Sequence, residues 1–227
     1  GAERARLHAR VAAALADRPG ASAARLAHHW CRATGDEAGA HAATWSVRAA
    51  REAVAGFGFE AAAAHYARAL SEPAVDRIPI LVEYGEALQL GGDTAAARVA
   101  LLDAARAAAA ADRANDLAQA ALALGGGVAG FEVAAHDDEQ TELLRQADRA
   151  LPAAEAGLRA AVRARLSLAL AGTVSDTERV RLASDAVGIA RRAGARQIES
   201  AALAAWCDAM AGPDHVRERL AAATRMV

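Results

Sequence analysis

The chain has 227 residues, and its 26 basic and 28 acidic side chains give a formal net charge of −2, with both signs mixed along the sequence. All the basic residues are arginine and none of them form a basic tract. This argues against direct nucleic-acid binding by the segment and removes the lysine that a P-loop or a Schiff base requires. Hydrophobic residues make up 54% of the chain but aromatic residues only 4%, so the apolar content is mainly alanine and leucine and favours helices over strands.

The first half of the chain predicts six helices separated by short turns. Leu7, Val11 and Leu15, spaced by four, predict an amphipathic helix over 3–17 that ends at Pro19-Gly20. Pro79 suits the first turn of a later helix, where its missing N–H does no harm. The other helices of this half are expected from Ser22 to Gly35, from Asp36 through Val54, over 60–71 and 80–90, and from Asp93 or Thr94 to about 111.

Two helix pairs within this half repeat one another at a spacing of 85 minus 50, or 35 residues. Small residues stand at the start of each pattern and twelve positions later, a larger apolar residue follows at sixteen, and a small one at nineteen. The matched pairs are Ala50 with Gly85, Ala62 with Ala97, Tyr66 with Leu101, and Ala69 with Ala104. This order is typical of tetratricopeptide repeats, whose period is about 34 residues and whose antiparallel helices approach closely where small side chains meet.

The second half of the chain predicts further helices but a weaker repeat. A helix over 117–124 ends at Gly125-Gly-Gly127, and residues 128–136 are not assigned to an element. Asp137 or Asp138 is expected to start the next helix, which runs over 139–151. The later helices are expected over 155–171, 176–193, 197–210 and from 214 to the end. The whole pattern predicts an all-α fold, an α-α superhelix (a tetratricopeptide-like solenoid) of about a dozen antiparallel helices.

Several stretches also resemble one protein family. They are Leu7–Leu15, Pro19-Gly20, Arg25–Trp30 and Thr34–Asp36 near the start, and Leu182–Gly194 and Gly212–Leu220 near the end. Together they resemble the middle region of large ATP-binding LuxR-family transcriptional regulators of the STAND class. The resemblance implies that residues 1–34 are a helical lead-in, combining the end of a winged-helix region with the first array helix, and that 35–227 form the repeat array. It also implies ATPase and helix-turn-helix modules outside this chain, which begins without Met inside a helical pattern.

The inner face of the repeats is the first candidate binding site, because the first helix of each tetratricopeptide repeat lines the concave surface. The mixture of apolar and charged side chains on this face suits a peptide or helix of a protein partner, or a small-molecule effector. Arg51 and Glu86 could instead pair with each other. The residues expected to line this groove are Thr44, Val47, Arg51 and Val54 in one repeat and Val82, Glu86 and Gln89 in the next.

A glycine-rich stretch is the second candidate. Gly125, Gly126, Gly127, Gly130 and Phe131 invite a phosphate-loop interpretation, but the preceding strand, the lysine and the GxGxxG order are all missing. The favoured interpretation is a helix C-cap followed by a turn. A binding loop at this place stays open as the alternative.

Metal, cofactor and catalytic sites are not predicted. His28 and His29 point about 100° apart on a helix, so they cannot share one ion unless His41 or His65 arrives from another helix. The acidic stretch 136–139 lies where a helix starts, and capping explains it. Since no nucleophile or cofactor motif accompanies these groups, we do not expect an enzyme.

The remaining expectations concern environment and function. Cys31 and Cys207 lack a CxxC partner, no apolar run reaches 18 residues and no signal peptide is present, which together predict free thiols in a cytoplasmic protein without a membrane span. Trp30, Trp45 and Trp206 are expected in the core. The first hypothesis is a non-catalytic sensor or scaffold segment that couples effector binding to the missing modules. The alternative is an oligomerisation element without a ligand of its own, and an enzyme on a helical solenoid has the least support.

Overall fold

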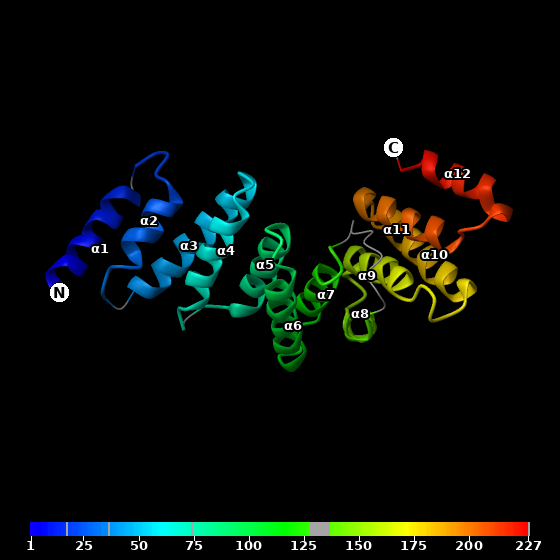
Figure 1. Cartoon of the computed structure of the whole chain (residues 1–227), viewed down its shortest axis with the longest axis horizontal. Helices are drawn as coiled ribbons and strands as arrows, with labels where there is room; N and C mark the ends of the chain where they lie inside the picture. Colours follow the sequence, from blue (N-terminus) through cyan, green and yellow to red (C-terminus); the bar gives the residue numbers. More distant parts are fainter. Residues whose placement is uncertain (17, 36, 74, 128–136, 227) are drawn as a thin grey trace. The chain divides into compact units, whose positions relative to one another are not determined.

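The computed structural model describes residues 1–16, 18–35, 37–73, 75–127 and 137–226. These residues form α-helices and one short 3-10 helix, with no strand among them (Figure 1). The helices are α1 (Ala2–Ala16), α2 (Ala23–Trp30), α3 (Ala38–Ala55), α4 (Phe59–Leu70), α5 (Arg77–Leu90), α6 (Thr94–Ala110), α7 (Ala114–Ala123), α8 (Asp138–Ala150), α9 (Ala156–Ala169), α10 (Asp176–Arg192), α11 (Arg196–Ala209), η1 (Pro213–His215) and α12 (Val216–Thr224).

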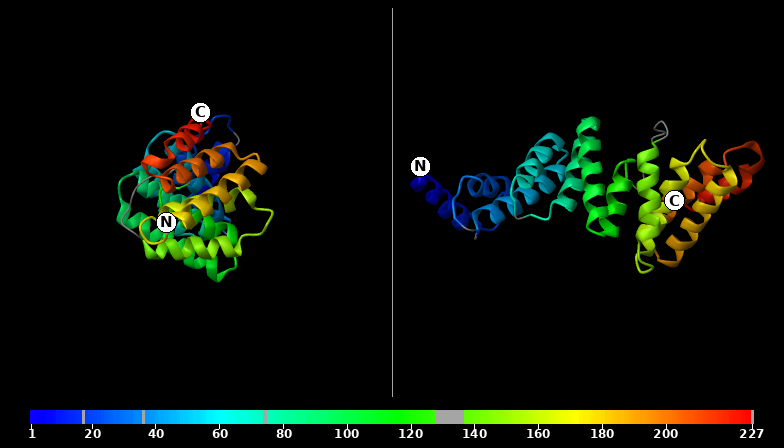
Figure 2. Two further views of the ribbon diagram at one scale, coloured as in Figure 1. Left: turned by 90° about the vertical axis from the view of Figure 1, so that its right-hand side faces the viewer. Right: turned by 90° about the horizontal axis from the view of Figure 1, so that it is seen from below.

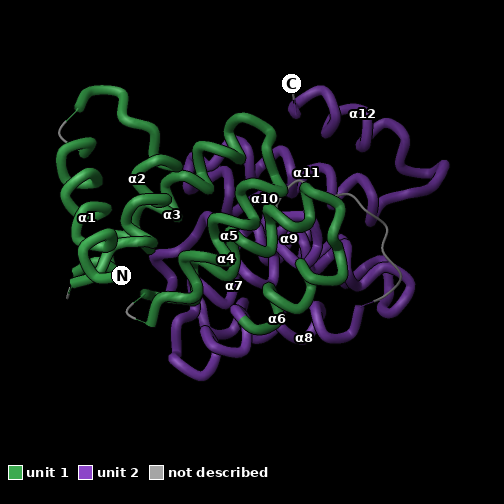
Figure 3. Tube along the Cα trace, turned by 60° about the vertical axis from the view of Figure 1, so that its left-hand side comes forward, with its two compact units in different colours: residues 1–103 green, residues 104–227 purple. Residues whose placement is uncertain are grey.

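The chain divides into two compact units, residues 1–103 and residues 104–227, and the boundary falls within α6 (Figure 3). In unit 1, helices α1 to α5 each pack on the next helix along the chain. In unit 2 the same holds from α7 to α12, and α9 also contacts α7 and α11. Successive helices within each unit lie side by side in the right-hand view of Figure 2. Packing between sequence neighbours confirms the predicted all-α, α-α solenoid class.

Local capping explains where several helices begin. Asp93 Oδ1 accepts a hydrogen bond from the Ala96 N–H at 3.0 Å, and Asp137 Oδ1 accepts one from the Gln140 N–H at 3.1 Å. Each such cap satisfies an amide that would otherwise lack an intrahelical partner and stabilises the helix by about 1 kcal/mol. Both caps lie where the sequence predicts them.

Three expected helix starts differ in detail, and one of them is that of α7, which begins three residues before the expected 117. Ser22 occupies the N-cap position of α2, but its side chain makes no capping hydrogen bond. α5 begins three residues before the expected 80, because Asp76 accepts a hydrogen bond from the Ile78 N–H and adds a turn that contains Pro79. Asp36, the expected cap of the third helix, lies outside the described residues.

The repeated positions are buried, as the pattern predicts. Tyr66 and Leu101, the two large members, are fully enclosed, and the small members at the other six positions are buried too. A Cβ atom added at Gly85 would lie 2.5 Å from Leu101 Cγ, which is too close for any side chain. The close approach of α5 to the Leu101 side chain therefore requires glycine at position 85.

Candidate functional site

The expected groove of unit 1 contains a polar clamp between helices. Arg51 on α3 donates to Glu83 on α5 through both Nε (2.8 Å to Oε2) and Nη2 (2.6 Å to Oε1). The Tyr66 hydroxyl, from α4, donates to the same Oε2 at 2.7 Å. Arg51 therefore pairs with Glu83 and not with Glu86, which was the alternative that the sequence left open.

The clamp changes the ionisation of its members. Burial acts to raise the pKa of Glu83, but the hydrogen bonds from Arg51 and Tyr66 outweigh it, and this pKa falls below its ordinary value. Burial, followed by the hydrogen bond to Glu83, raises the pKa of Tyr66. The Glu86 side chain is solvent-accessible, yet crowding by surrounding protein atoms reduces its hydration and, together with the charge of Glu83, raises its pKa.

The other expected groove residues divide between surface and interior. Val82 is only 5% exposed, so it packs inside unit 1 and does not line a groove. Val47 and Val54 are half-buried against the core cluster that contains Ala50. The Thr44 hydroxyl donates to its own helix, to the Ala40 carbonyl oxygen at 2.8 Å. Arg51 and Glu86 are thus the charged groups of this face that reach solvent, and Gln89 is half-buried beside them along α5.

The glycine stretch ends α7. The N–H of Gly126 donates to the Ala123 carbonyl and that of Gly127 donates to the Leu122 carbonyl, both at 3.0 Å. Both glycines have positive φ, 79° and 77°, the left-handed geometry of a helix C-cap. Gly125 is buried, and an added Cβ there would collide with the Gln140 side chain. The cap interpretation is confirmed, whereas Gly130 and Phe131 lie outside the described residues and the binding-loop alternative stays a prediction.

Histidines gather at a place that the sequence did not indicate. His8 of α1 joins His28 and His29 of α2, with His8 Nδ1 2.9 Å from His29 Nδ1 and ring centroids 5.1 to 6.2 Å apart. Burial lowers the pKa of His8 and of His28, and the neighbouring histidines and arginines add to this shift.

The two histidines that could have completed a metal site lie elsewhere. The His41 ring stacks on Trp30 with centroids 4.3 Å apart, and His65 Nδ1 lies 3.1 Å from Arg68 Nη1. No group of three or more His, Cys, Asp and Glu side chains in the described ranges could hold a metal ion.

The tryptophans and cysteines are half-buried. The expectation that Trp30, Trp45 and Trp206 belong to the core is therefore only partly met, since each keeps an edge at the surface. Trp45, for example, lies 5.1 Å beneath the Arg48 guanidinium. Cys31 and Cys207 are both free thiols, as expected.

Unit 2 contains a hollow that sequence reasoning missed. It has a volume of about 270 Å³ and lies between α10, α11 and α12. Apolar side chains form most of its wall, namely Val187, Leu203, Trp206, Ala221 and Ala222. No motif signals such a site, because it requires three helices to be packed together.

Three polar side chains also line this hollow, Ser184, Glu218 and Arg225. Arg225 Nη2 donates to Glu199 Oε1 at 2.8 Å, and the same carboxylate oxygen accepts a hydrogen bond from Arg191 Nε at 3.1 Å. Glu199 thereby joins α10 and α11 to the arginine that follows α12. An apolar wall with a few polar groups is the usual composition of a small-molecule site.

Comparison of the chain with protein-family models, with curated proteins and with solved structures gave no match. In the part of the chain that the structure describes, no helix combines the length and apolar character needed to cross a bilayer.

Proposed function

We propose that the chain is a non-catalytic sensor segment of a cytoplasmic transcriptional regulator, which binds an effector and couples this binding to ATPase and DNA-binding modules elsewhere in the parent protein. The regulator part is supported by the resemblance of the stretches within 7–36 and 182–220 to LuxR-family regulators of the STAND class. A solenoid suits such coupling because each helix packs mainly on helices close to it in the sequence, so a change at one position passes along the chain.

The binding part is supported by the hollow between α10, α11 and α12. Its wall is mostly apolar, and it carries the carboxylate of Glu218, the guanidinium of Arg225 and the hydroxyl of Ser184. A ligand in it would contact three helices at once. The described polar contacts, in contrast, are mainly arginine–carboxylate pairs and hydroxyls bonded to backbone, which hold helices together and supply no activated nucleophile.

A thermal-shift screen of the purified chain against a metabolite panel, with nucleotides included, tests this function. A ligand bound only by the folded state stabilises it by about 2.7 kcal/mol at a hundredfold excess over Kd, which gives a measurable upward shift. The variant Ala221→Phe fills the hollow from its exposed side and should abolish the shift. Ala223→Phe, on the same helix but outside the hollow, is the matched control and should retain it.

Two outcomes of this screen oppose the proposal. If no compound shifts the unfolding temperature, effector binding loses its support and protein partners become the next class to test by pull-down with the Arg51 and Glu86 face. If Ala221→Phe responds like the wild type, the effector binds elsewhere. The regulator part is tested separately, since the parent gene should encode an ATP-binding module before this segment and a DNA-binding module after it.

Self-association is the second candidate function, and one observation favours it. α1 exposes Leu7 (49%) and Val11 (42%), and α12 exposes Val216 (57%) and Leu220 (67%). Each pair is spaced by four residues and so forms an apolar strip on its helix. Light scattering over a concentration series should then show a dimer or larger species that Leu220→Gln weakens. A monomer at every concentration would exclude this function for the isolated chain.

A further inference from the structure

The two charged groups of the hollow between α10, α11 and α12 differ in whether they already form hydrogen bonds to other side chains. The bond of Arg225 Nη2 to Glu199 uses one of the five N–H donors of a guanidinium. Glu218 forms no hydrogen bond or ion pair with any other residue that the structure describes, and it faces the same hollow. The hollow therefore presents a carboxylate without a partner and a guanidinium with further donors.

These two charges lie on the same side of α12. Their positions differ by 225 minus 218, or seven residues, which is close to two helical turns of 3.6 residues. Both side chains consequently line the hollow from the side of α12. Val187, Leu203 and Trp206 form the apolar surface on the other side.

We propose that this hollow binds a small zwitterion with an apolar body, of the size and charge of an apolar amino acid. The ammonium group of the ligand pairs with the Glu218 carboxylate, the ligand carboxylate accepts hydrogen bonds from Arg225, and the apolar body packs on Trp206. The inference rests on the proposed effector-binding function and specifies the chemical class of the effector.

Charge complementarity favours a zwitterion over a ligand with a single charge. A simple cation would pair with Glu218 but place its apolar part against the unused donors of Arg225, and a simple anion would do the reverse. Either ligand removes water from a charged group without replacing its hydrogen bonds, which is costly. A zwitterion satisfies both groups, because its ammonium and its carboxylate each form a charge-assisted hydrogen bond, and it therefore binds more tightly than either singly charged ligand.

The size of the hollow limits the ligand. A volume of about 270 Å³ favours a small ligand, of the size of an amino acid. This is below the usual range for sites of drug-sized molecules. Because such a ligand contacts α12 through two charges and α10 and α11 through its apolar body, its binding fixes the last helix onto the rest of unit 2.

Three probes with one ring and different charges test the inference: L-phenylalanine, phenethylamine and 3-phenylpropanoate. Isothermal titration calorimetry on the full chain should give measurable binding of L-phenylalanine and at least tenfold weaker binding of the two singly charged analogues. L-Leucine and L-tryptophan extend the series in size. Trp206 is the one tryptophan of unit 2 in the sequence, so a change in its fluorescence on binding, absent in Trp206→Phe, places the ligand beside it.

Substitutions of Glu218 and of Arg225 test the contribution of each charge separately. Glu218→Gln and Arg225→Gln should each weaken L-phenylalanine binding at least tenfold, whereas Glu178→Gln and Arg217→Gln, which remove charges outside the hollow, should leave it unchanged. Arg225→Gln also loses the bond to Glu199, so its unfolding temperature is measured in parallel. If Arg225→Gln does not fold, the binding measured for Glu218→Gln decides the test.

The outcomes distinguish this inference from the function on which it rests. If the metabolite screen finds a ligand that Ala221→Phe abolishes but that ligand is not a zwitterion, the inference is overturned and the effector-binding function stands. If no zwitterion binds and no other compound does, both are overturned. Equal affinity for L-phenylalanine and phenethylamine overturns the role of Arg225 alone and reduces the ligand class to organic cations.

Discussion

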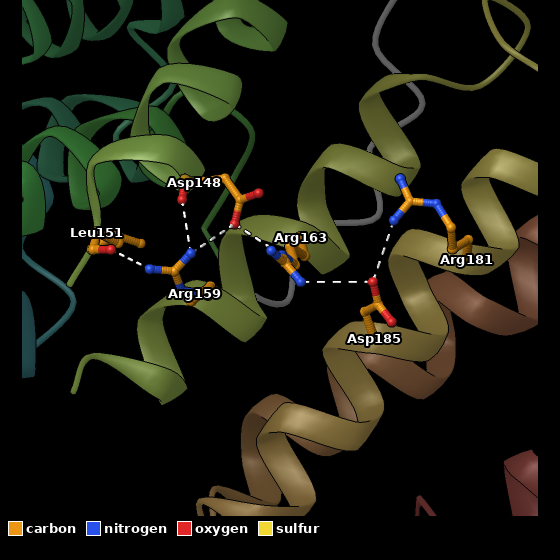
Figure 4. Close-up of polar contacts among 6 residues, drawn as sticks. All are labelled: Asp148, Leu151, Arg159, Arg163, Arg181 and Asp185. Atoms are coloured by element: carbon orange, nitrogen blue, oxygen red, sulfur yellow. Dashed lines mark hydrogen bonds and ion pairs between the residues drawn. The ribbon is translucent and has the colours of Figure 1, made fainter. Parts of the chain in front are cut away.

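Both units pack their helices through small buried residues, but they differ in the polar side chains that connect the helices. In unit 1 the repeated small residues let helices approach closely, and the clamp of Arg51, Glu83 and Tyr66 adds polar contacts across three of them. In unit 2 arginine side chains connect successive helices. Arg163 of α9 donates through Nε to Asp148 of α8 at 2.9 Å, and its Nη1 lies 3.6 Å from Asp185 of α10 (Figure 4).

Two other arginines of unit 2, one before and one after Arg163 in the sequence, form similar contacts. Arg159 donates to the backbone carbonyl of Asp148 at 3.0 Å and also to that of Leu151, while Arg181 Nη1 lies 3.4 Å from Asp185 Oδ2 (Figure 4). A long arginine side chain can reach a carboxylate or carbonyl from several backbone positions. In unit 2 such contacts add to a core of small residues, in which Ala164, Ala183 and Ala202 pack together.

Removal of the Arg179 side chain should lower the free energy of unfolding more than any other single substitution considered. This side chain is 6% exposed, its Nε donates to the Ser167 carbonyl at 3.0 Å, and it also donates to Asp208. Arg179→Met leaves the Ser167 carbonyl without its donor and removes the partner of Asp208, whose side chain is about half exposed, so we expect a loss of about 2 to 3 kcal/mol in the free energy of unfolding. Urea unfolding followed by circular dichroism measures it.

The matched control is Arg181→Met on the same helix. Arg181 is well exposed and its ion pair with Asp185 is open to solvent, so the expected loss is about 0.5 kcal/mol or less. Equal losses in the two variants would show that the buried arginine does not hold unit 2 together.

The close helix approach of unit 1 should make Gly85→Ala destabilising by about 2 kcal/mol. The added Cβ lies 2.5 Å from Leu101 Cγ, and the overpacking outweighs the gain of about 1 kcal/mol in helix propensity. Gly188→Ala in α10 is the control, because the nearest atom there is the mobile end of Arg192 at 3.3 Å. That variant should be stabilising or neutral in the same unfolding assay, and a stabilised Gly85→Ala would refute the steric explanation.

The clamp of unit 1 should contribute a smaller, pH-dependent stability. Arg51→Met is expected to cost about 1 kcal/mol at pH 7, since Arg51 is largely exposed although its pair with Glu83 is bidentate. The pKa of Glu83 is lower in the folded chain, so this contribution is complete above the ordinary glutamate pKa and is lost as the pH falls below it. Unfolding at pH 7 and at pH 3 should show a large and a small difference from wild type, respectively, and an equal difference would rule out an ionic role for Glu83.

The histidine contact of α1 with α2 should give the smallest effect, confined to the first helix. The groups that face His8 and His28 are all basic or neutral, namely Arg4 on α1, His29 on α2, Arg32 and Arg68. Because the pKa values of His8 and His28 are lowered in the folded chain, α1 docks fully above their ordinary value of about 6.5 and docks less well as the pH falls below it.

Hydrogen exchange of the α1 amides, corrected for intrinsic rates, measures this effect. Protection should decrease between pH 7.5 and pH 5.5 in the wild type and change less in His8→Gln. The α5 amides, far along the chain from these histidines, provide the internal reference. Unchanged protection of α1 over this range would refute histidine-linked docking.

The sequence alone determined the class of fold and most helix ends to within two residues, although α2 ends at Trp30 and not at the expected Gly35. These features depend on residues within a few positions of one another, such as the cap at Asp93, the glycine C-cap at Gly126 and the alternation of small and large residues around Tyr66 and Leu101. The repeat also predicts a small residue at position 85, whose counterpart is Ala50, whereas the need for glycine there comes from the contact with Leu101.

Only the tertiary structure decided which side chains meet between helices. Glu83 and Glu86 are one turn apart on α5, and the rotation of that helix against α3 selects Glu83 for Arg51, 32 residues away. His8 reaches His29 across 21 residues, and the hollow beside Trp206 exists only because α10, α11 and α12 pack around it. Local spacing fixes the faces of a helix, but the contacts of a face depend on the depth and angle at which the next helix packs, and these arise from the whole set of side chains between them.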